Sequence, residues 1–232
     1  MKSTSTTTPT LQACRECGAG APLDAHFCPQ CTKILPLQRQ ADYFSFLGLP
    51  RKLKVDVADL EQRFRALSRQ FHPDFFYNAT PAERRASLER SSYLNDAYRT
   101  LRQPISRIEY LLKLEGLGAS GPAEASKQVP PGLLEEVFAL NEELDEVRDA
   151  RAAGAPAADW RGRLERARQP IEAKRVEHEA QLQELSARWD ALADRSKDDA
   201  DRGTVLQALA ERFLERNYIN NLLAGIEREL SS

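Results

Sequence analysis

The sequence predicts an all-α protein, in which a helical hairpin and a C-terminal antiparallel three-helix bundle follow a small cysteine-rich head. Three observations lead to this fold class. Of the 232 residues, 41% are hydrophobic and 29% charged but only 7% aromatic, a balance that favours soluble helices over a β-sandwich. Apolar residues recur every three or four positions in most segments after residue 42. All four cysteines fall within one 18-residue stretch near the N-terminus.

Charge and hydropathy argue against two classes of partner. A net charge of −2 does not supply the concentrated basic field that nucleic-acid binding needs. The chain has no apolar run long enough to span a bilayer, so we expect no membrane partner. Residues 1–13 have neither the apolar core of a secretory signal nor the arginines of an organellar presequence. We therefore expect a disordered leader and a protein of a reducing cytosol.

The head contains two CxxC pairs, Cys14 with Cys17 and Cys28 with Cys31. A reducing compartment favours metal ligation over disulfides, and two such pairs can turn four thiolates toward one ion. Two glycines and a proline between the pairs let the chain turn back on itself. Four thiolates leave no open coordination position, so we predict a structural Zn²⁺ in a zinc ribbon or knuckle of residues 14–36. A knuckle this small should be unfolded without its metal.

Other chemistry stays open for these cysteines. A redox dithiol normally lies at a helix N-terminus in a βαβ context, which the sequence does not show. An iron–sulfur cluster on four thiolates is a further alternative. His26 could ligate, but four cysteines already satisfy the ion, so we expect His26 at the surface.

The first helices follow the head. Residues 42–50 predict a short aromatic helix with an Asp42 cap and a stop at Gly48. Asp56 caps a longer helix, whose opposite face carries Arg65 and Arg69. The buried stripe of that helix is expected to be Val57, Leu60, Phe64, Leu67 and Phe71.

The next helix is predicted to begin with a capping box at Thr80 and Glu83, with proline at its first position. Its inward face is expected to be Leu94, Ala97, Tyr98 and Leu101. Pro73 ends the preceding helix, so the two helices form an antiparallel pair. The connector of this pair displays His72, Pro73 and Asp74 beside the basic face.

Residues 42–116 resemble a J-domain, the DnaJ-type module, with the His-Pro-Asp motif intact. The resemblance implies that the loop and the basic helix bind the ATPase domain of a DnaK- or HscA-like chaperone and stimulate its ATP hydrolysis. The contact residues are then expected to be His72, Pro73, Asp74, Arg65 and Arg69. Hydrolysis would occur in the partner, and the chain has no Gly-rich phosphate loop, so we do not expect it to be an enzyme.

A short helix over 104–115 is expected to pack back onto the J-domain, and residues 117–132, rich in Gly, Ala, Ser and Pro, predict a linker. A bundle is predicted over 133–232, with helices at about 133–152, at 160–192 with a kink at Pro170, and at 205–230. The separators are short and polar, which favours antiparallel neighbours. In the second of these helices, His178, Trp160 and Trp189 are expected to be packing residues.

The first bundle helix has an anomaly. Its core stripe is expected to be Leu133, Val137, Leu140, Leu144 and Val147. Leu134 and Phe138 lie roughly 120° to 160° from that stripe, on the side that carries several carboxylates. They form a candidate partner patch, unless another helix or the J-domain covers them.

The order of J-domain, linker and acidic bundle resembles the HscB family, the J-type co-chaperones of iron–sulfur cluster assembly. The string from Leu133 to Val147 is similar to that family's first bundle helix. The resemblance implies that an iron–sulfur cluster scaffold protein binds here and at the last helix. The scaffold-binding residues are then Leu134, Phe138, Glu142, Glu146 and Tyr218. Glu135 stands where an apolar residue is usual, and Ala139 where an acid is usual.

The sequence leaves competing functions open. They are a general J-domain co-chaperone for other clients, a zinc-ribbon module that binds nucleic acid and a dithiol oxidoreductase. The first 41 residues carry four basic and two acidic side chains, which are too few for a phosphate footprint. A tetracysteine head occurs in a subset of the HscB family, including its mitochondrial members. Without a presequence we expect a bacterial cytosol, with the mitochondrial matrix as the alternative.

Overall fold

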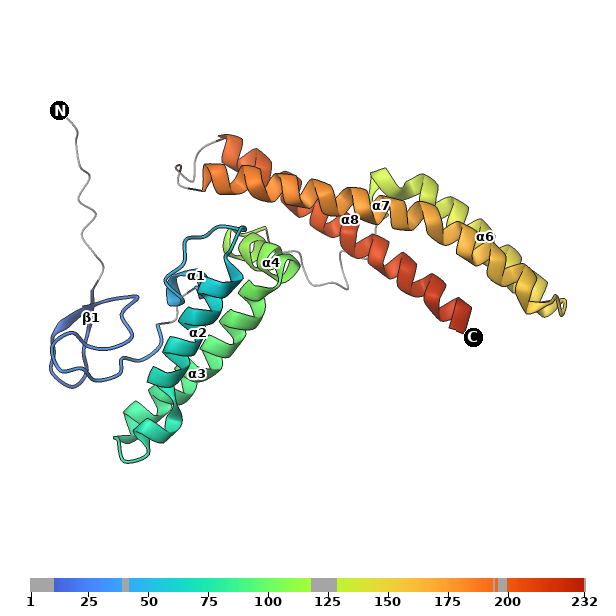
Figure 1. Ribbon diagram of the computed structural model, residues 1–232. Coiled ribbons are helices and arrows are strands. Elements are labelled where there is room, and N and C mark those ends of the chain that lie inside the picture. Colours follow the sequence, from blue (N-terminus) through green and yellow to red (C-terminus); the bar gives the residue numbers. More distant parts are fainter. Residues whose placement is uncertain (1–10, 39–41, 118–128, 194, 196–199, 232) are drawn as a thin grey trace. The chain divides into compact units, whose positions relative to one another are not determined.

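The computed structural model describes residues 11–38, 42–117, 129–193, 195 and 200–231. The chain divides into two compact units, Met1–Arg107 and Ile108–Ser232 (Figure 1). Most of the predicted leader and most of the predicted linker, residues 118–128, lie outside the described residues.

The first unit begins with a two-stranded antiparallel sheet. Strand β1 (Leu11–Ala13) pairs with β2 (Gly20–Pro22), so that Leu11 lies opposite Pro22. The sheet therefore starts three residues before the expected beginning of the knuckle. Gly18 adopts a φ of +75° in the turn after the first cysteine pair, and its N–H donates to the Cys14 carbonyl at 2.9 Å.

Four helices and one 3₁₀ turn follow. They are α1 (Tyr43–Phe46), α2 (Val57–Phe71), η1 (Pro73–Phe76), α3 (Pro81–Arg102) and α4 (Pro104–Leu114). The division between the two units falls within α4, whose residues from Ile108 onward belong to the second unit. The predicted caps are confirmed: Asp42 accepts from Ser45 N, Asp56 accepts from Ala58 N, and Thr80 forms a reciprocal capping box with Glu83. In Figure 1, α2 and α3 lie side by side as a hairpin, with η1 in its connector.

The core of the hairpin largely follows the predicted stripes. Leu60 and Phe71 of α2 are fully buried, as are Ala97 and Leu101 of α3. Phe64 stacks on Tyr98 with ring centroids 4.3 Å apart. Val57 was predicted in the stripe but is 43% exposed, because it is the first residue of α2 and no preceding turn of helix covers it.

The second unit contains η2 (Pro131–Leu133), α6 (Leu134–Ala152), α7 (Ala157–Leu192) and α8 (Ala200–Ser231). Helix α7 packs against both α6 and α8. Ion pairs of Lys174 with Glu136 and of Arg163 with Glu143 show that α6 and α7 run antiparallel. The expected helices are present, but α7 and α8 each begin a few residues earlier than predicted, and α7 stays helical through Pro170.

The bundle core joins all three helices. Leu164 and Ile171 of α7 pack with residues of α6 and α8 in one cluster. His178, Trp160 and Trp189 are buried, as predicted. In the parts of the chain that the structure describes, none of the helices combines the length and apolar character that a membrane span requires.

Candidate metal centre and interaction surfaces

The four cysteine sulfurs converge on one point in the head. The Sγ atoms all lie within 4.8 Å of one another, with Cys14 and Cys31 3.7 Å apart and Cys17 and Cys28 3.6 Å apart. These separations are too long for disulfide bonds, and the cysteines are free. A tetrahedral ion with metal–sulfur bonds of about 2.3 Å needs sulfurs about 3.8 Å apart, so the donor set fits a thiolate-bound metal.

Within the second CxxC pair the thiolate form is favoured at Cys28. The backbone N–H of Cys31 lowers the pKa of Cys28 to about 7, and that of Gln30 acts in the same direction. At Cys31 the backbone N–H of Lys33 also lowers the pKa, but burial and the neighbouring thiols outweigh it and raise the pKa to about 12. Cys28 and Cys14 are buried, whereas Cys17 is exposed. Beside these thiols, Ala21 and Leu35 complete the small interior of the head. The site therefore has the chemistry of a structural metal centre.

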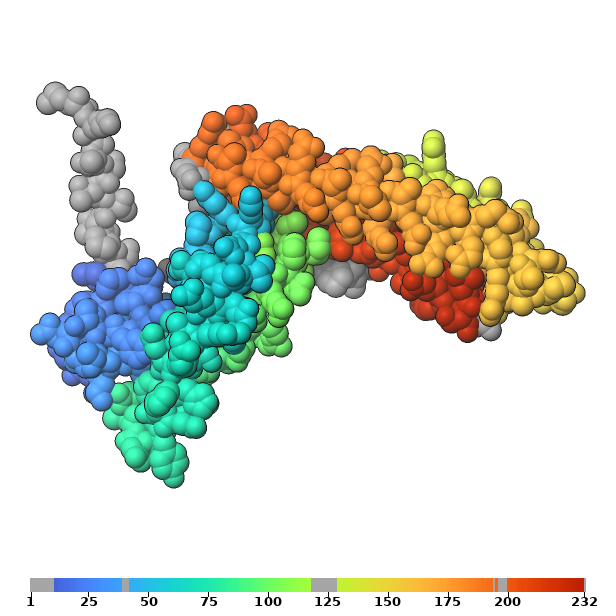
Figure 2. All heavy atoms as spheres, in the orientation of Figure 1, coloured from blue at the N-terminus to red at the C-terminus, as the bar shows by residue number. Residues whose placement is uncertain are grey.

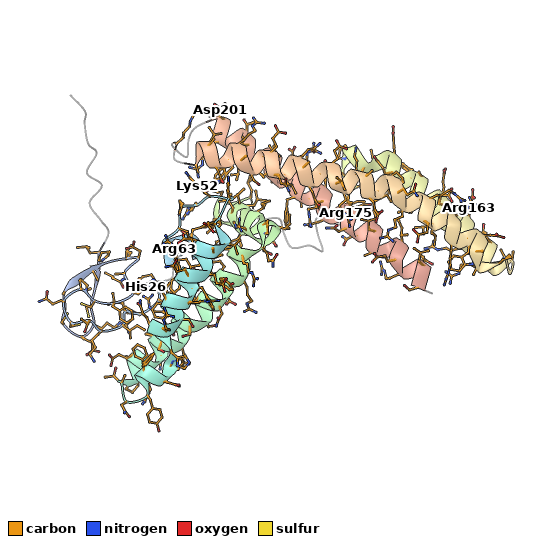
Figure 3. The ribbon with its side chains drawn as sticks, viewed as in Figure 1. His26, Lys52, Arg63, Arg163, Arg175 and Asp201 are labelled. Atoms are coloured by element: carbon orange, nitrogen blue, oxygen red, sulfur yellow. The ribbon has the colours of Figure 1, made fainter. Side chains whose placement is uncertain are left out.

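His26 is not the surface residue that the sequence suggested. It lies between the head and the hairpin (Figure 3) and packs edge-on against Phe46 and Phe71, with ring centroids 4.8 Å and 5.1 Å away. Its Nδ1 is 2.7 Å from Nη1 of Arg90, and this nitrogen must accept because a guanidinium only donates. Burial and, to a smaller extent, the charge of Arg90 together lower the pKa of His26 to about 4.

A second contact joins the head to the start of α3. Lys33 forms an ion pair with Glu83 at 3.0 Å, and the Glu83 side chain is 7% exposed. Its carboxylate also accepts from the backbone N–H of Thr80 at 3.1 Å. The Lys33 ammonium holds the pKa of Glu83 below its usual value. Glu83, predicted only as a capping residue, thus also holds the head.

The His-Pro-Asp tripeptide lies in an exposed loop at the tip of the α2–α3 hairpin, which protrudes from the first unit (Figure 2). The side chains of His72 and Asp74 are 53% and 86% exposed. Within the loop, the backbone N–H of Asp74 donates to Nδ1 of His72 at 3.3 Å. Phe75 and Tyr77, which the sequence analysis did not single out, are also exposed. The loop therefore offers polar and aromatic groups to a partner.

The end of α2 that carries this loop is anchored from α3. The carbonyl oxygen of Phe71, the residue before His72, accepts from the hydroxyls of Ser87 at 2.6 Å and Ser91 at 3.0 Å. On the outer face of α2, Arg65 pairs with Glu61 at 2.5 Å, and Arg69 is exposed. The predicted basic residues thus lie on the second half of α2, and the predicted loop residues follow its last residue.

The apolar patch predicted on the first bundle helix is exposed. Leu134 and Phe138 are 42% and 66% exposed, so within the second unit the other bundle helices do not cover them. Glu142 is exposed beside them. Glu146 forms an ion pair with Arg163 of α7, which also binds Glu143.

Tyr218 of α8 is half-buried against the bundle core. Leu222 of the same helix is also half-buried and packs against the same core cluster. A partner at Tyr218 would therefore touch only part of the ring.

Comparison with known proteins gives a consistent result. The mouse "Iron-sulfur cluster co-chaperone protein HscB" is 36% identical over 138 residues, which is 60% of this chain and 57% of the relative. The human protein of that name is 38% identical over 129 residues, 56% of this chain and 54% of the relative. The matched part thus spans a little over half the length of these curated relatives. No protein-family model matches the chain.

Solved structures match over more of the chain. The crystal structure of human co-chaperone protein HscB superposes with a TM-score of 0.63 at 26% identity, covering 94% of this chain and 98% of that one. The chaperone HscB from Vibrio cholerae gives 0.53 at 29% identity, covering 82% and 98%. The predicted fold class is confirmed. The two curated relatives are mammalian, so they do not support the expected bacterial origin.

Proposed function

Since the chain is a homologue of the HscB co-chaperones in sequence and fold, we propose that it is a co-chaperone of iron–sulfur cluster assembly. Its two interaction surfaces would join a DnaK- or HscA-like ATPase to a cluster scaffold protein. The observation that carries the proposal is the presence, on the fold shared with these relatives, of an exposed loop at His72–Asp74 and an exposed apolar patch at Leu134 and Phe138.

The chaperone would bind at the tip of the hairpin. Asp74 supplies an exposed carboxylate in the loop, and Arg69 and Arg65 supply positive charge along α2. Charged groups of this kind steer a weak encounter and set its register. Phe75 and Tyr77 add apolar area next to the tripeptide, which favours a desolvated contact. ATP hydrolysis is assigned to the partner's own site.

The scaffold would bind on α6. A patch of large apolar side chains rimmed by carboxylates suits a protein partner with an apolar centre and a basic rim. Leu134 and Phe138 supply the centre, and Glu142 lies beside them. Glu146 forms an ion pair with Arg163, so it would contact the scaffold either after this ion pair breaks or with Arg163 still bound to it. Tyr218 would add a partial aromatic contact from α8.

The metal of the head would be Zn²⁺ in a structural role. Four thiolates at these separations satisfy a tetrahedral ion with no open position, and Zn²⁺ is the usual metal of such sites. When bound, the ion would supply cross-linking of the two CxxC pairs and no chemistry on a substrate. Metal analysis of the purified chain should give one zinc and no iron per chain.

Two substitutions test the division of labour. Asp74→Asn should abolish stimulation of an Hsp70-type ATPase while leaving scaffold binding unchanged. Asp96→Asn, at a half-exposed carboxylate of α3 that pairs with Arg99, is the control for the loss of one negative charge outside the loop. Phe138→Ala should weaken scaffold binding by about tenfold or more, since truncation of a central aromatic commonly costs over 1 kcal/mol. Val176→Ala on α7, at 63% exposure against 66% for Phe138, is its control. A single substitution that removed both activities would contradict the proposal.

A further inference from the structure

A buried arginine connects the tetracysteine head to the hairpin. Arg90 of α3 is 2% exposed. Its Nε donates to the carbonyl of Leu35 at 2.7 Å, and its Nη2 donates to those of Pro36 at 3.2 Å and Ala25 at 3.4 Å. Its Nη1 donates to His26 at 2.7 Å. All four acceptors belong to the head, and they flank the Cys28–Cys31 pair on both sides.

The same guanidinium touches the helix end that carries the His-Pro-Asp loop. The Cζ atom of Arg90 lies 5.7 Å from the ring centroids of both Phe71 and Phe46. Phe71 is the last residue of α2 and is followed directly by His72. The rings of His26 and Phe27 also pack on Phe71, at centroid distances of 5.1 Å and 5.9 Å. The head therefore covers the side chain that precedes the loop.

The acceptors of Arg90 depend on the fold of the metal-binding segment. Residues 26–35 form a loop that two backbone hydrogen bonds hold together, from Cys28 N to the Lys33 carbonyl and from Leu35 N to the His26 carbonyl. The buried cluster of the head consists of Cys14, Ala21, Cys28 and Leu35, with Ala19, Ala25 and Cys31 packed against it. An apolar interior of this size does not stabilise a fold alone, so the thiolate–metal bonds must do so. Without the metal, Arg90 would keep its charge in a buried place and lose its ordered acceptors.

We propose that Arg90 is a positioning residue through which metal bound in the head holds the last turn of α2, and with it the loop at His72–Asp74. The metal-loaded head is then part of the chaperone-binding element and not an independent appendage. The activity readout of this inference rests on the proposed function, whereas its structural readout does not.

The experiment compares three full-length chains, with zinc in excess and after removal of zinc by a chelator. They are the unaltered protein, Arg90→Gln and Arg107→Gln. Arg107 is a matched control because it is also buried, at 4% exposure, but donates to the carbonyls of Leu101, Leu53 and Arg102, outside the head. The readouts are amide hydrogen exchange over residues 71–77, zinc affinity and the concentration that half-maximally stimulates an Hsp70-type ATPase.

In the unaltered chain, removal of zinc should accelerate exchange at residues 71–77 by about tenfold, a typical size for coupling between two sites, while residues 94–102 keep their protection. Arg90→Gln should show fast exchange at 71–77 even with zinc bound and little further response to the chelator. Because coupling is reciprocal, its zinc affinity should fall by a similar factor. Arg107→Gln should keep the full response to zinc. In each chain and condition with faster exchange at residues 71–77, the concentration of chain that half-maximally stimulates the ATPase should be higher. The maximal ATPase rate should stay constant.

Three results would overturn the inference. They are exchange at 71–77 that does not respond to zinc in the unaltered chain, an equal acceleration along the whole hairpin, and an Arg90→Gln chain that responds to zinc as strongly as the unaltered one. If exchange behaves as expected but no chain stimulates an ATPase, the positioning role of Arg90 stands and the chaperone function proposed for the loop is rejected. Since the chelator acts on the unaltered protein, a failure of Arg90→Gln to fold leaves the first two results decisive.

Discussion

The carbonyl that precedes the His-Pro-Asp loop accepts hydrogen bonds from two hydroxyls. A double-mutant cycle measures what these two hydrogen bonds contribute to the stability of the hairpin. Ser87 is fully buried and donates to the Phe71 oxygen at 2.6 Å, whereas Ser91 is half-buried and donates at 3.0 Å. A net hydrogen bond contributes about 0.5–1.5 kcal/mol, so Ser87→Ala should cost about 1 kcal/mol and Ser91→Ala slightly less. In either single variant the carbonyl keeps one donor.

The double variant removes both donors. A buried carbonyl without a partner costs about 1–3 kcal/mol of desolvation, so the double substitution should cost about 3 kcal/mol. This exceeds the sum of the single effects by about 1 kcal/mol, within the usual coupling range for residues that share a partner. Such a positive coupling term is the specific expectation.

Hydrogen exchange of the slowest amides in α2 and α3 measures the cost, because both tryptophans lie in the other unit and do not report on the hairpin. Fluorescence of Trp160 and Trp189 should give an unchanged urea midpoint in all variants and serves as the internal control. Strictly additive effects, or a double variant that costs less than about 1 kcal/mol, would show that the Phe71 carbonyl does not need these hydroxyls.

Three further predictions follow, two on the stability of the bundle and one on metal binding by the head. Burial lowers the pKa of His178 in the folded chain, although the Glu215 carboxylate, 3.3 Å from its Nδ1, acts in the opposite direction. Between the folded and the unfolded pKa of this histidine the unfolded chain binds more protons, so bundle stability should fall as pH drops below about 6.5. His178→Leu should flatten this pH dependence in urea melts. Leu164→Ala should lower bundle stability by about 2–5 kcal/mol in melts followed by tryptophan fluorescence, against under about 0.5 kcal/mol for exposed Val176→Ala. Cys14→Ser should abolish stoichiometric zinc binding, measured by metal analysis, because three thiolates and a hydroxyl hold the ion far less tightly.

Local sequence signals predicted most of the helices. The caps at Asp42, Asp56 and Thr80 were predicted correctly because an N-cap depends on a side chain and backbone groups two or three residues away. The start of α8 was placed at Val205 but lies at Ala200, because a polar first turn contributes no apolar periodicity to detect. Helix ends without strong capping signals are therefore where the prediction was weakest.

In the candidate sites too, residues with a local sequence signal were predicted and a residue held by distant contacts was missed. Spacing alone predicted that the four cysteines come together, because two CxxC pairs constrain their own geometry within a few residues. Exposure of Leu134 and Phe138 followed from helical phase. Arg90 was missed, since an arginine on a predicted helix is ordinarily solvated and its acceptors lie between 54 and 65 residues away in sequence.

The sequence by itself determined the helical class, the His-Pro-Asp loop, the cluster of four cysteines and the outward patch on α6. Each of these depends on contacts within one or two turns of chain, or on the chemistry of a short motif. Only the tertiary structure decided that the head packs on the hairpin, that His26 lies in this contact and that Arg90 bonds to the tetracysteine head. Those features join residues distant in sequence, and the burial of a charge depends on which surfaces meet and not on the local pattern around it.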